Sequence, residues 1–265
     1  MTKTTLNFVH ANGFPSGSYQ ALFDNFPENI NVIALDKYGH HPDYPVKNNW
    51  QPLVEQLINF IEEQHKFAEP VIAVGHSFGG VLSFIAACQR PDLFKGLIML
   101  DPPVFTGSVA MMAKIIKKTP LIDKFSPAGR AKKRRSHWPL NTNVAKLFSR
   151  RSLFKNFDQR CLNDYVKHGI IEKNDQLELA FSAEIEAEIF RDLPTNLSSY
   201  KNKLTIPAKL IYAEQTDVCP IHFFEKFAKL NKALHLASVQ GGHMFPLERP
   251  EETAQLIMDT IKEFS

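Results

Sequence analysis

Short apolar stretches alternate along the chain with longer segments in which apolar residues recur three or four positions apart. The short stretches are rich in branched aliphatic residues, which is typical of strands covered on both faces. The longer segments have the periodicity of helices with one buried face. The pattern predicts six strands, at residues 6–10, 31–36, 70–75, 96–101, 208–214 and 233–239.

Helices are predicted between these strands. The clearest covers residues 50–64, where Trp50, Leu53, Leu57 and Ile61 share one face. Others are predicted at residues 17–26, 81–89 and 221–230, and at the C-terminal end, where Ala254, Ile257, Met258 and Ile261 recur with helical spacing. Repeated strand–helix units favour an α/β fold, a mostly parallel, doubly wound sheet with helices on both faces.

Residues 103–203 interrupt this alternation after the fourth strand. The stretch contains no good strand, so we expect a helical cap inserted over the carboxyl edge of the sheet. The flanking residues, 1–102 and 204–265, would then form the core of one domain. A chain of 265 residues, 44% of them hydrophobic, is long enough to bury such a core.

The charge of the predicted cap is uneven. Basic residues, including KKRR at 132–135, dominate residues 104–160, and acidic residues dominate 172–192. Two solvated helical faces that partly neutralise each other are the simplest interpretation. The alternative is a basic rim that attracts anionic substrates, a membrane surface or nucleic acid through residues 114–135.

Composition narrows the class of protein further. A net charge of +3 is too close to neutral to indicate bulk nucleic-acid binding. Cys88, Cys161 and Cys219 are far apart and odd in number, which argues against a disulfide framework or a structural zinc site and favours a reducing compartment. Neither a signal peptide nor a membrane span is predicted, so we expect a cytoplasmic protein. The oligomeric state is not visible in the sequence.

The strongest chemical signal is GHSFGG at residues 75–80, which contains G-x-S-x-G. It lies directly after a predicted buried strand and directly before a predicted helix, where a sharp turn would expose the hydroxyl of Ser77. Gly75 and Gly79 would let the chain reverse without side-chain collisions. The N-terminus of the following helix would favour developing negative charge. We therefore predict that Ser77 is a nucleophile.

A serine hydroxyl needs a neighbouring base at neutral pH. His243 is the best-placed histidine, because it lies in the glycine-rich loop VQGGHMFPLERPE between the last strand and the last helix. Two glycines would let this loop bend the imidazole back over the sheet edge. His76 is adjacent to Ser77, but we expect it to point elsewhere from the turn and to be packed or supporting.

The imidazole in turn needs a carboxylate to fix its tautomer. Asp217 follows the strand at 208–214 and gives the chain order Ser…Asp…His, so it is the favoured acid. Asp101, at the end of the strand at 96–101, is the alternative acid. Glu214 is a distant third candidate.

A tetrahedral intermediate also needs two backbone N–H donors for its oxyanion. Phe78, the residue after the nucleophile, should supply one of them. The loop HANGFPSGSY after the first strand should supply the other, with Gly13 making room for the turn and Phe14 as the expected donor. Asn12 and His10 could hold this loop or contact substrate.

These residues together resemble the α/β-hydrolase superfamily, in particular its serine esterase and lipase-like members with a helical cap. The resemblance rests on HANGFP at 10–15, GHSFGG at 75–80, Thr216–Asp217 and GGHMFPLERPEE at 241–252. It implies an eight-stranded, mostly parallel sheet, a cap after the sixth strand and a Ser–His–acid triad. The first two strands of the superfamily have no counterpart among the six predicted here. Dehalogenase and epoxide-hydrolase members carry aspartate where this chain has Ser77.

The expected function is hydrolysis of a carboxylic ester through an acyl-enzyme, without a metal or organic cofactor. A small-molecule ester is the expected partner. Thioesterase, carbon–carbon bond hydrolase and acyltransferase activity remain open, because they use the same triad. A non-catalytic ligand-binding protein with the same fold is the alternative from another class. Candidates for the substrate pocket are Asn12, His76, Phe105 and Met244, with Phe125, Phe148 and Phe154 as further aromatic candidates in the insertion.

Overall fold

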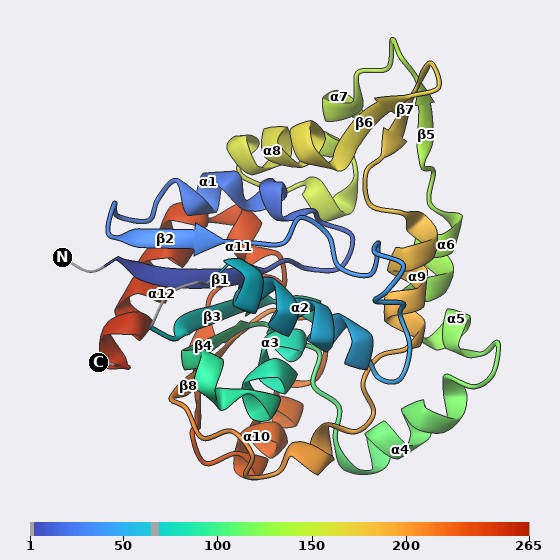
Figure 1. The fold of residues 1–265 in the computed structure, drawn as a ribbon. Helices are drawn as coiled ribbons and strands as arrows, with labels where there is room; N and C mark the ends of the chain where they lie inside the picture. The colour runs from blue at the N-terminus through green and yellow to red at the C-terminus, as the bar shows by residue number, and fades with distance from the viewer. Residues whose placement is uncertain (1–2, 65–68, 265) are drawn as a thin grey trace.

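The computed structural model describes residues 3–64 and 69–264. At its centre is a sheet of six parallel strands in the order β2-β1-β3-β4-β8-β9 (Figure 1). The strands are β1 (Thr4–Val9), β2 (Ile30–Ile33), β3 (Val71–His76), β4 (Phe94–Leu100), β8 (Ala208–Ala213) and β9 (Leu234–Val239). The predicted six-stranded, doubly wound α/β sheet is therefore confirmed, although β2 ends three residues earlier than predicted.

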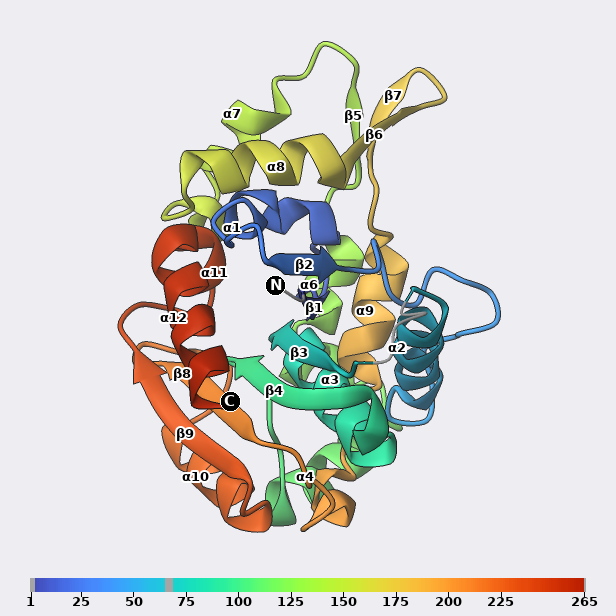
Figure 2. The ribbon, with the colours of Figure 1, turned by 60° about the vertical axis from the view of Figure 1, so that its left-hand side comes forward.

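Helices cover both faces of this sheet because side chains alternate along each strand. Leu6 and Ile72 belong to one buried cluster, whereas Val9 and Ala73 belong to the other. The cluster that contains Val9 is completed by α2 (Gln51–Gln64), α3 (Phe78–Gln89) and α10 (Ile221–Leu230). The cluster that contains Leu6 lies on the opposite face and is completed by α1 (Gln20–Phe23) and α12 (Pro250–Glu263) (Figure 2).

The insertion between β4 and β8 contains six α-helices among its described residues. They are α4 (Gly107–Ile116), α5 (Ile122–Phe125), α6 (Ala128–Lys133), α7 (Val144–Ser149), α8 (Gln159–Gly169) and α9 (Ala183–Arg191). In Figure 1, α6 and α9 stand beyond the carboxyl ends of the central strands. This is the edge at which parallel α/β sheets hold their functional residues.

The expectation that this insertion contains no strand is wrong. It holds an antiparallel sheet in the order β5-β7-β6, formed by β5 (His137–Pro139), β6 (Ile170–Lys173) and β7 (Gln176–Leu179). Asn174 and Asp175 connect β6 to β7 with φ angles of 51° and 56°, as the two residues of a tight hairpin turn require. The strands have only three or four residues, too few to show a clear alternation in the sequence.

The remaining short elements join the larger ones. They are the 3-10 helices η1 (Ser16–Tyr19), η2 (Pro91–Leu93), η3 (Ser152–Phe154) and η4 (Leu197–Tyr200) and the short helix α11 (Phe245–Glu248). The helix predicted at 17–26 is thus divided between η1 and α1. Among the described residues, no helix has both the length and the apolar character needed to cross a membrane.

Candidate active site

Ser77 lies in the turn between β3 and α3 with φ 55° and ψ −119°. A positive φ is a strained conformation for serine, and the glycines at positions 75 and 79 make room for the turn that requires it. A Cβ atom on Gly75 would lie 2.2 Å from the Gly79 carbonyl oxygen, and one on Gly79 would lie 2.1 Å from the Val9 carbonyl oxygen. The turn therefore needs glycine at both positions, and it presents Ser77 at the carboxyl end of the sheet.

The structure brings Ser77 to His243, which follows β9 in the loop before α11. His243 Nε2 lies 3.1 Å from Ser77 Oγ, and His243 Nδ1 lies 2.7 Å from Asp101 Oδ2. A carboxylate can only accept, so Nδ1–H donates to Asp101 and leaves Nε2 to accept the hydroxyl proton of Ser77. This is the order of hydrogen bonds that a serine nucleophile, its base and an orienting acid require.

The favoured assignment of Asp217 as the partner of His243 is contradicted by this geometry. Asp217 is exposed in the turn after β8, whereas Asp101 is fully buried and holds the histidine. Asp101 also accepts hydrogen bonds from the Ala213 amide at 3.0 Å and the Thr216 hydroxyl at 2.7 Å. Because β4 and β8 are neighbours in the sheet, their ends approach the same place, and burial together with the hydrogen bond to His243 distinguishes the two aspartates.

A buried hydrogen-bond network supports the site, and His76 is at its centre. His76 Nε2–H donates to the His243 carbonyl at 3.0 Å, so His76 Nδ1 accepts from the Tyr19 hydroxyl at 2.7 Å. The Tyr19 hydroxyl accepts from the Ala11 amide at 3.1 Å. Burial lowers the pKa of His76 well below its usual value, which keeps the ring neutral and this order of donors intact. His76 is thus a supporting residue and not part of a pocket wall.

Tyr19 was not identified from the sequence. It lies in η1 and belongs to the buried cluster beneath α1, so its sequence context is that of an ordinary core aromatic. Only the fold shows that its hydroxyl joins the loop after β1 to the nucleophile turn. No sequence signal separates Tyr19 from the other core aromatics, because the need of its hydroxyl for a partner follows from its burial in the folded protein.

The loop after β1 holds its shape through His10. Its Nδ1–H donates to the Ala11 carbonyl at 2.8 Å, and its Nε2 accepts from the Tyr38 amide at 3.3 Å. Burial lowers the pKa of His10 to about 4, so the ring is neutral as these bonds require. Gly13 in this loop has φ +84°, a conformation that favours glycine.

The expected oxyanion donor in this loop, Phe14, already uses its amide. It donates to the Ala11 carbonyl at 3.1 Å, which closes the turn. Within the described part of the chain, the amides of Asn12 and Gly13 have no acceptor. Phe78 begins α3, so its amide has no carbonyl of the preceding turn to bind.

An ion pair in the insertion, between the half-buried Arg134 and the buried Glu186, covers this loop. Arg134 Nε lies 2.9 Å from Glu186 Oε2, and the Glu186 carbonyl accepts from Asn12 Nδ2 at 2.9 Å. A Cβ atom on Gly13 would lie 3.0 Å from the Glu186 carboxyl carbon. Burial raises the pKa of Glu186 to about 6 despite the neighbouring guanidinium. Arg134 belongs to the KKRR run, for which the sequence predicts only a solvated or basic surface.

The remaining candidates for the pocket, four phenylalanines and Met244, separate into three groups. Phe148 and Phe154 are buried in an aromatic cluster that also contains Phe14 and Tyr165. Phe105 is half-buried and packs against the ring of Phe223, and Met244 is buried beside His243. Phe125 is 68% exposed, so its expected place in a pocket wall is wrong.

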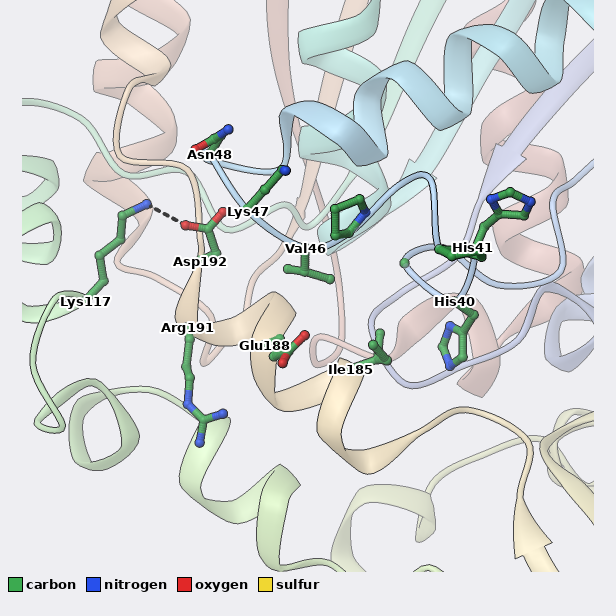
Figure 3. A pocket seen from close by; sticks show the side chains of 13 residues that line it. His40, His41, Val46, Lys47, Asn48, Lys117, Ile185, Glu188, Arg191 and Asp192 are labelled. Carbon is green, nitrogen blue, oxygen red and sulfur yellow. Dashed lines mark hydrogen bonds and ion pairs between the residues drawn. The ribbon is translucent and has the colours of Figure 1, made fainter.

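A separate groove of about 750 Å³ lies between the loop that precedes α2 and helix α9 (Figure 3). Its lining contains none of the residues Ser77, His243 and Asp101. Among the residues that line it, Lys117 is paired with Asp192 at 3.0 Å and Arg191 is paired with Asp123 at 2.6 Å. Elsewhere in the described chain, no group of three or more His, Cys, Asp or Glu side chains is placed to hold a metal ion.

Comparison with known sequences places this site in a family context. A model of the alpha/beta hydrolase family matches residues 8–256. The chain is 25% identical over 272 residues to the uncharacterized hydrolase YugF of Bacillus subtilis, covering 98% of this chain and 90% of that protein. It is also 25% identical over 229 residues to the type I acyl-CoA thioesterase mpaH of Penicillium roqueforti, of which it spans 45%.

Solved structures show the same fold. E-2-(acetamidomethylene)succinate hydrolase superimposes with a TM-score of 0.77 at 19% identity, covering 99% of this chain and 92% of that one. The thioesterase domain from the curacin biosynthetic pathway gives a TM-score of 0.76 at 18% identity, covering 97% and 91%. At these identities the likeness establishes the fold alone.

Proposed function

The chain belongs to the alpha/beta hydrolase family, and on that premise we propose that it is a serine hydrolase that cleaves carboxylic esters. One observation carries the proposal, the continuous hydrogen-bond series from Ser77 Oγ through His243 to Asp101. A structural serine in a turn has no need of a histidine that is itself oriented by a buried carboxylate.

In the proposed reaction, His243 Nε2 takes the hydroxyl proton as Ser77 Oγ attacks the ester carbonyl. Asp101 holds the imidazole in the required tautomer and stabilises the imidazolium that forms. The tetrahedral intermediate collapses when His243 protonates the departing alcohol. Water activated by the same histidine then releases the acid from the acyl-enzyme.

The oxyanion would be held by two backbone amides. Phe78 supplies the first, at the N-terminus of α3, where the helix dipole adds to the stabilisation. The second would come from Asn12 or Gly13, whose amides have no acceptor among the described residues, and not from Phe14. This assignment revises the expectation drawn from the sequence.

We further propose that residues 103–203 act as a cap over the active site. The hydrogen bond from Asn12 to the Glu186 carbonyl supports this arrangement, because it joins the insertion directly to the loop after β1. The residues of the insertion that lie next to Gly13, Glu186 among them, would then face the acyl or alcohol portion of the substrate.

Thioester hydrolysis is the second candidate, supported by the similarity to an acyl-CoA thioesterase over 80% of this chain. Carbon–carbon bond hydrolysis and acyl transfer would use the same proton transfers. The triad alone does not separate these activities, because the leaving group is recognised by other contacts.

Hydrolysis of p-nitrophenyl acetate, butyrate and octanoate by the wild type and by Ser77→Ala tests the proposal. Butyryl-CoA in the same assay, with free thiol as the readout, compares the thioester directly with the oxygen ester of the same acyl group. Turnover that disappears in Ser77→Ala supports a serine hydrolase, and the preferred substrate names the bond. Equal turnover by the wild type and Ser77→Ala would reject Ser77 as the nucleophile. A folded wild type inactive on every substrate would favour the ligand-binding alternative.

A further inference from the structure

Helix α4 is apolar in composition but almost entirely unburied. Seven of its ten residues are apolar: Val109, Ala110, Met111, Met112, Ala113, Ile115 and Ile116. Only Ala110 among them is buried. A helix of this composition normally packs its apolar face against the rest of the protein. In this chain α4 leaves that face uncovered.

The uncovered side chains continue beyond α4 into α5. Large exposed apolar residues in this segment are Val109, Met111, Met112, Ile115, Leu121 and Phe125, with exposed fractions between 37% and 68%. Single exposed apolar residues are ordinary, but six within seventeen positions concentrate exposed apolar surface in one segment, as interaction surfaces do. We call residues 107–125 the docking segment.

Positive charge is interleaved with this apolar surface. Lys114, Lys118 and Lys124 are exposed within the docking segment. Its one acidic residue, Asp123, is ion-paired with Arg191 at 2.6 Å and so offers little free negative charge. In Figure 1, α4 and α5 lie at the outer edge of the molecule, away from the central sheet.

We propose that the docking segment binds the surface of a lipid bilayer that contains anionic headgroups. Apolar side chains enter the boundary between headgroups and acyl chains, while lysines at the same depth contact negative headgroups. The exposed apolar residues supply burial and the lysines supply charge complementarity. Neither component requires a helix that spans the bilayer.

Two other occupants fit the same surface less well. A second copy of this chain, placed by a two-fold axis, would bring the same lysines together across the contact. A nucleic acid would satisfy the lysines but would leave Met111, Met112 and Ile115 without an apolar partner. The combination of both side-chain types on one uncovered helix favours the lipid surface.

Cosedimentation of the full chain with vesicles tests the proposal. Vesicles of phosphatidylcholine and phosphatidylglycerol in equal parts should sediment the protein, and vesicles of phosphatidylcholine alone should sediment it much less. Replacing Lys114 and Lys118 by glutamine should lower partitioning onto the anionic vesicles by roughly fivefold for each lysine. Raising the salt concentration should weaken binding in the same direction.

The apolar contribution is tested by Met112→Ser combined with Ile115→Ser. These side chains are exposed, so circular dichroism and thermal unfolding should remain as in the wild type, while vesicle binding falls at least tenfold. Ile221→Ser and Lys226→Gln on α10 are matched controls, because they alter exposed residues of the same types outside the docking segment. Both should bind vesicles as the wild type does.

Three results would overturn the proposal. One is that the folded wild type binds neither vesicle type. Another is that the serine variant binds as tightly as Ile221→Ser. The third is that the protein self-associates in sedimentation velocity or binds duplex DNA but does not bind vesicles, and that this association disappears in the docking-segment variants. None of these measurements depends on esterase activity, so the proposed function and this inference can fail separately.

Discussion

His243 Nδ1 and Asp101 Oδ2 lie 2.7 Å apart, although 142 positions separate the two residues in the chain. The aspartate is fully buried at the end of β4, in a backbone conformation with φ 45°. Its two oxygens accept three hydrogen bonds, from Ala213, Thr216 and His243. A carboxylate satisfied in this way is fixed in one orientation, and it fixes the imidazole in turn.

The choice between the two aspartates can be tested by a matched pair of variants. Asp101→Asn should lower kcat for the best ester substrate by roughly 10⁴-fold, the effect of this change in the serine-protease triad. Asp217→Asn alters an exposed carboxylate and should change kcat by less than about twofold. Steady-state kinetics of both, with circular dichroism to confirm folding, decides the assignment. The opposite ranking would return the role to Asp217.

The network through Tyr19 predicts a positioning effect on the active site. Tyr19→Phe leaves the Ala11 amide and His76 Nδ1 without their partner, which should lower the free energy of unfolding by about 1–3 kcal/mol. It should also lower kcat by a larger factor than it changes KM. The change loosens the loop after β1, which would hold the oxyanion, and it loosens His76, which binds the carbonyl of His243.

Tyr44→Phe is the control for this change. The hydroxyl of Tyr44 also accepts a hydrogen bond, from Asn59, but that bond is exposed and distant in sequence from the site. In urea unfolding and steady-state kinetics, Tyr44→Phe should therefore stay close to the wild type, whereas Tyr19→Phe should lose both stability and kcat. If Tyr19→Phe retains wild-type kcat and loses only stability, the network is structural and does not position the site.

The close approach at Gly79 predicts a stability effect from a single methyl group. Gly79→Ala would place Cβ 2.1 Å from the Val9 carbonyl oxygen, and β1 cannot move away without breaking its pairing with β3. We expect a loss of more than about 2 kcal/mol in the free energy of unfolding, measured by urea denaturation. A Cβ atom on Gly242 meets nothing within 4 Å, so Gly242→Ala should be tolerated. Equal stability of the two variants would contradict the geometry.

The buried His10 predicts that the protein loses stability in acid. Its pKa falls from 6.5 to about 4 on folding because burial disfavours the charged ring. Between these values the unfolded chain binds a proton that the folded protein does not, so the free energy of unfolding decreases as the pH decreases. From about pH 7 to about pH 5, His10 alone accounts for a loss of about 2 kcal/mol.

The measurement is urea unfolding of the wild type and His10→Gln at both pH values. The variant is less stable overall, because two buried hydrogen bonds are disturbed, but its loss between the two pH values should be smaller by about 2 kcal/mol. His235→Gln, at an exposed position, should keep the wild-type dependence. An unchanged pH dependence in His10→Gln would mean that another group is responsible.

The sequence by itself determined the features that depend on local order. The alternation of short apolar runs with amphipathic segments placed the six central strands and the helices between them, because burial on a sheet or helix face imposes a period on the chain. GHSFGG at 75–80 and the glycine-rich loop around His243 were also visible, since a strained turn and a bent loop need glycine at fixed positions. Those two motifs identified the serine and the histidine that the structure brings together.

The tertiary structure alone decided which distant groups meet. Asp101 and Asp217 follow neighbouring strands, and only the hydrogen bond in the folded protein shows which of them holds His243. The amide of Phe14 was unsuitable as an oxyanion donor because it closes its own turn, and the exposure of α4 depends on what does not pack against it. Hydrogen-bond partners and buried area are properties of pairs of segments, so the period of one segment cannot contain them.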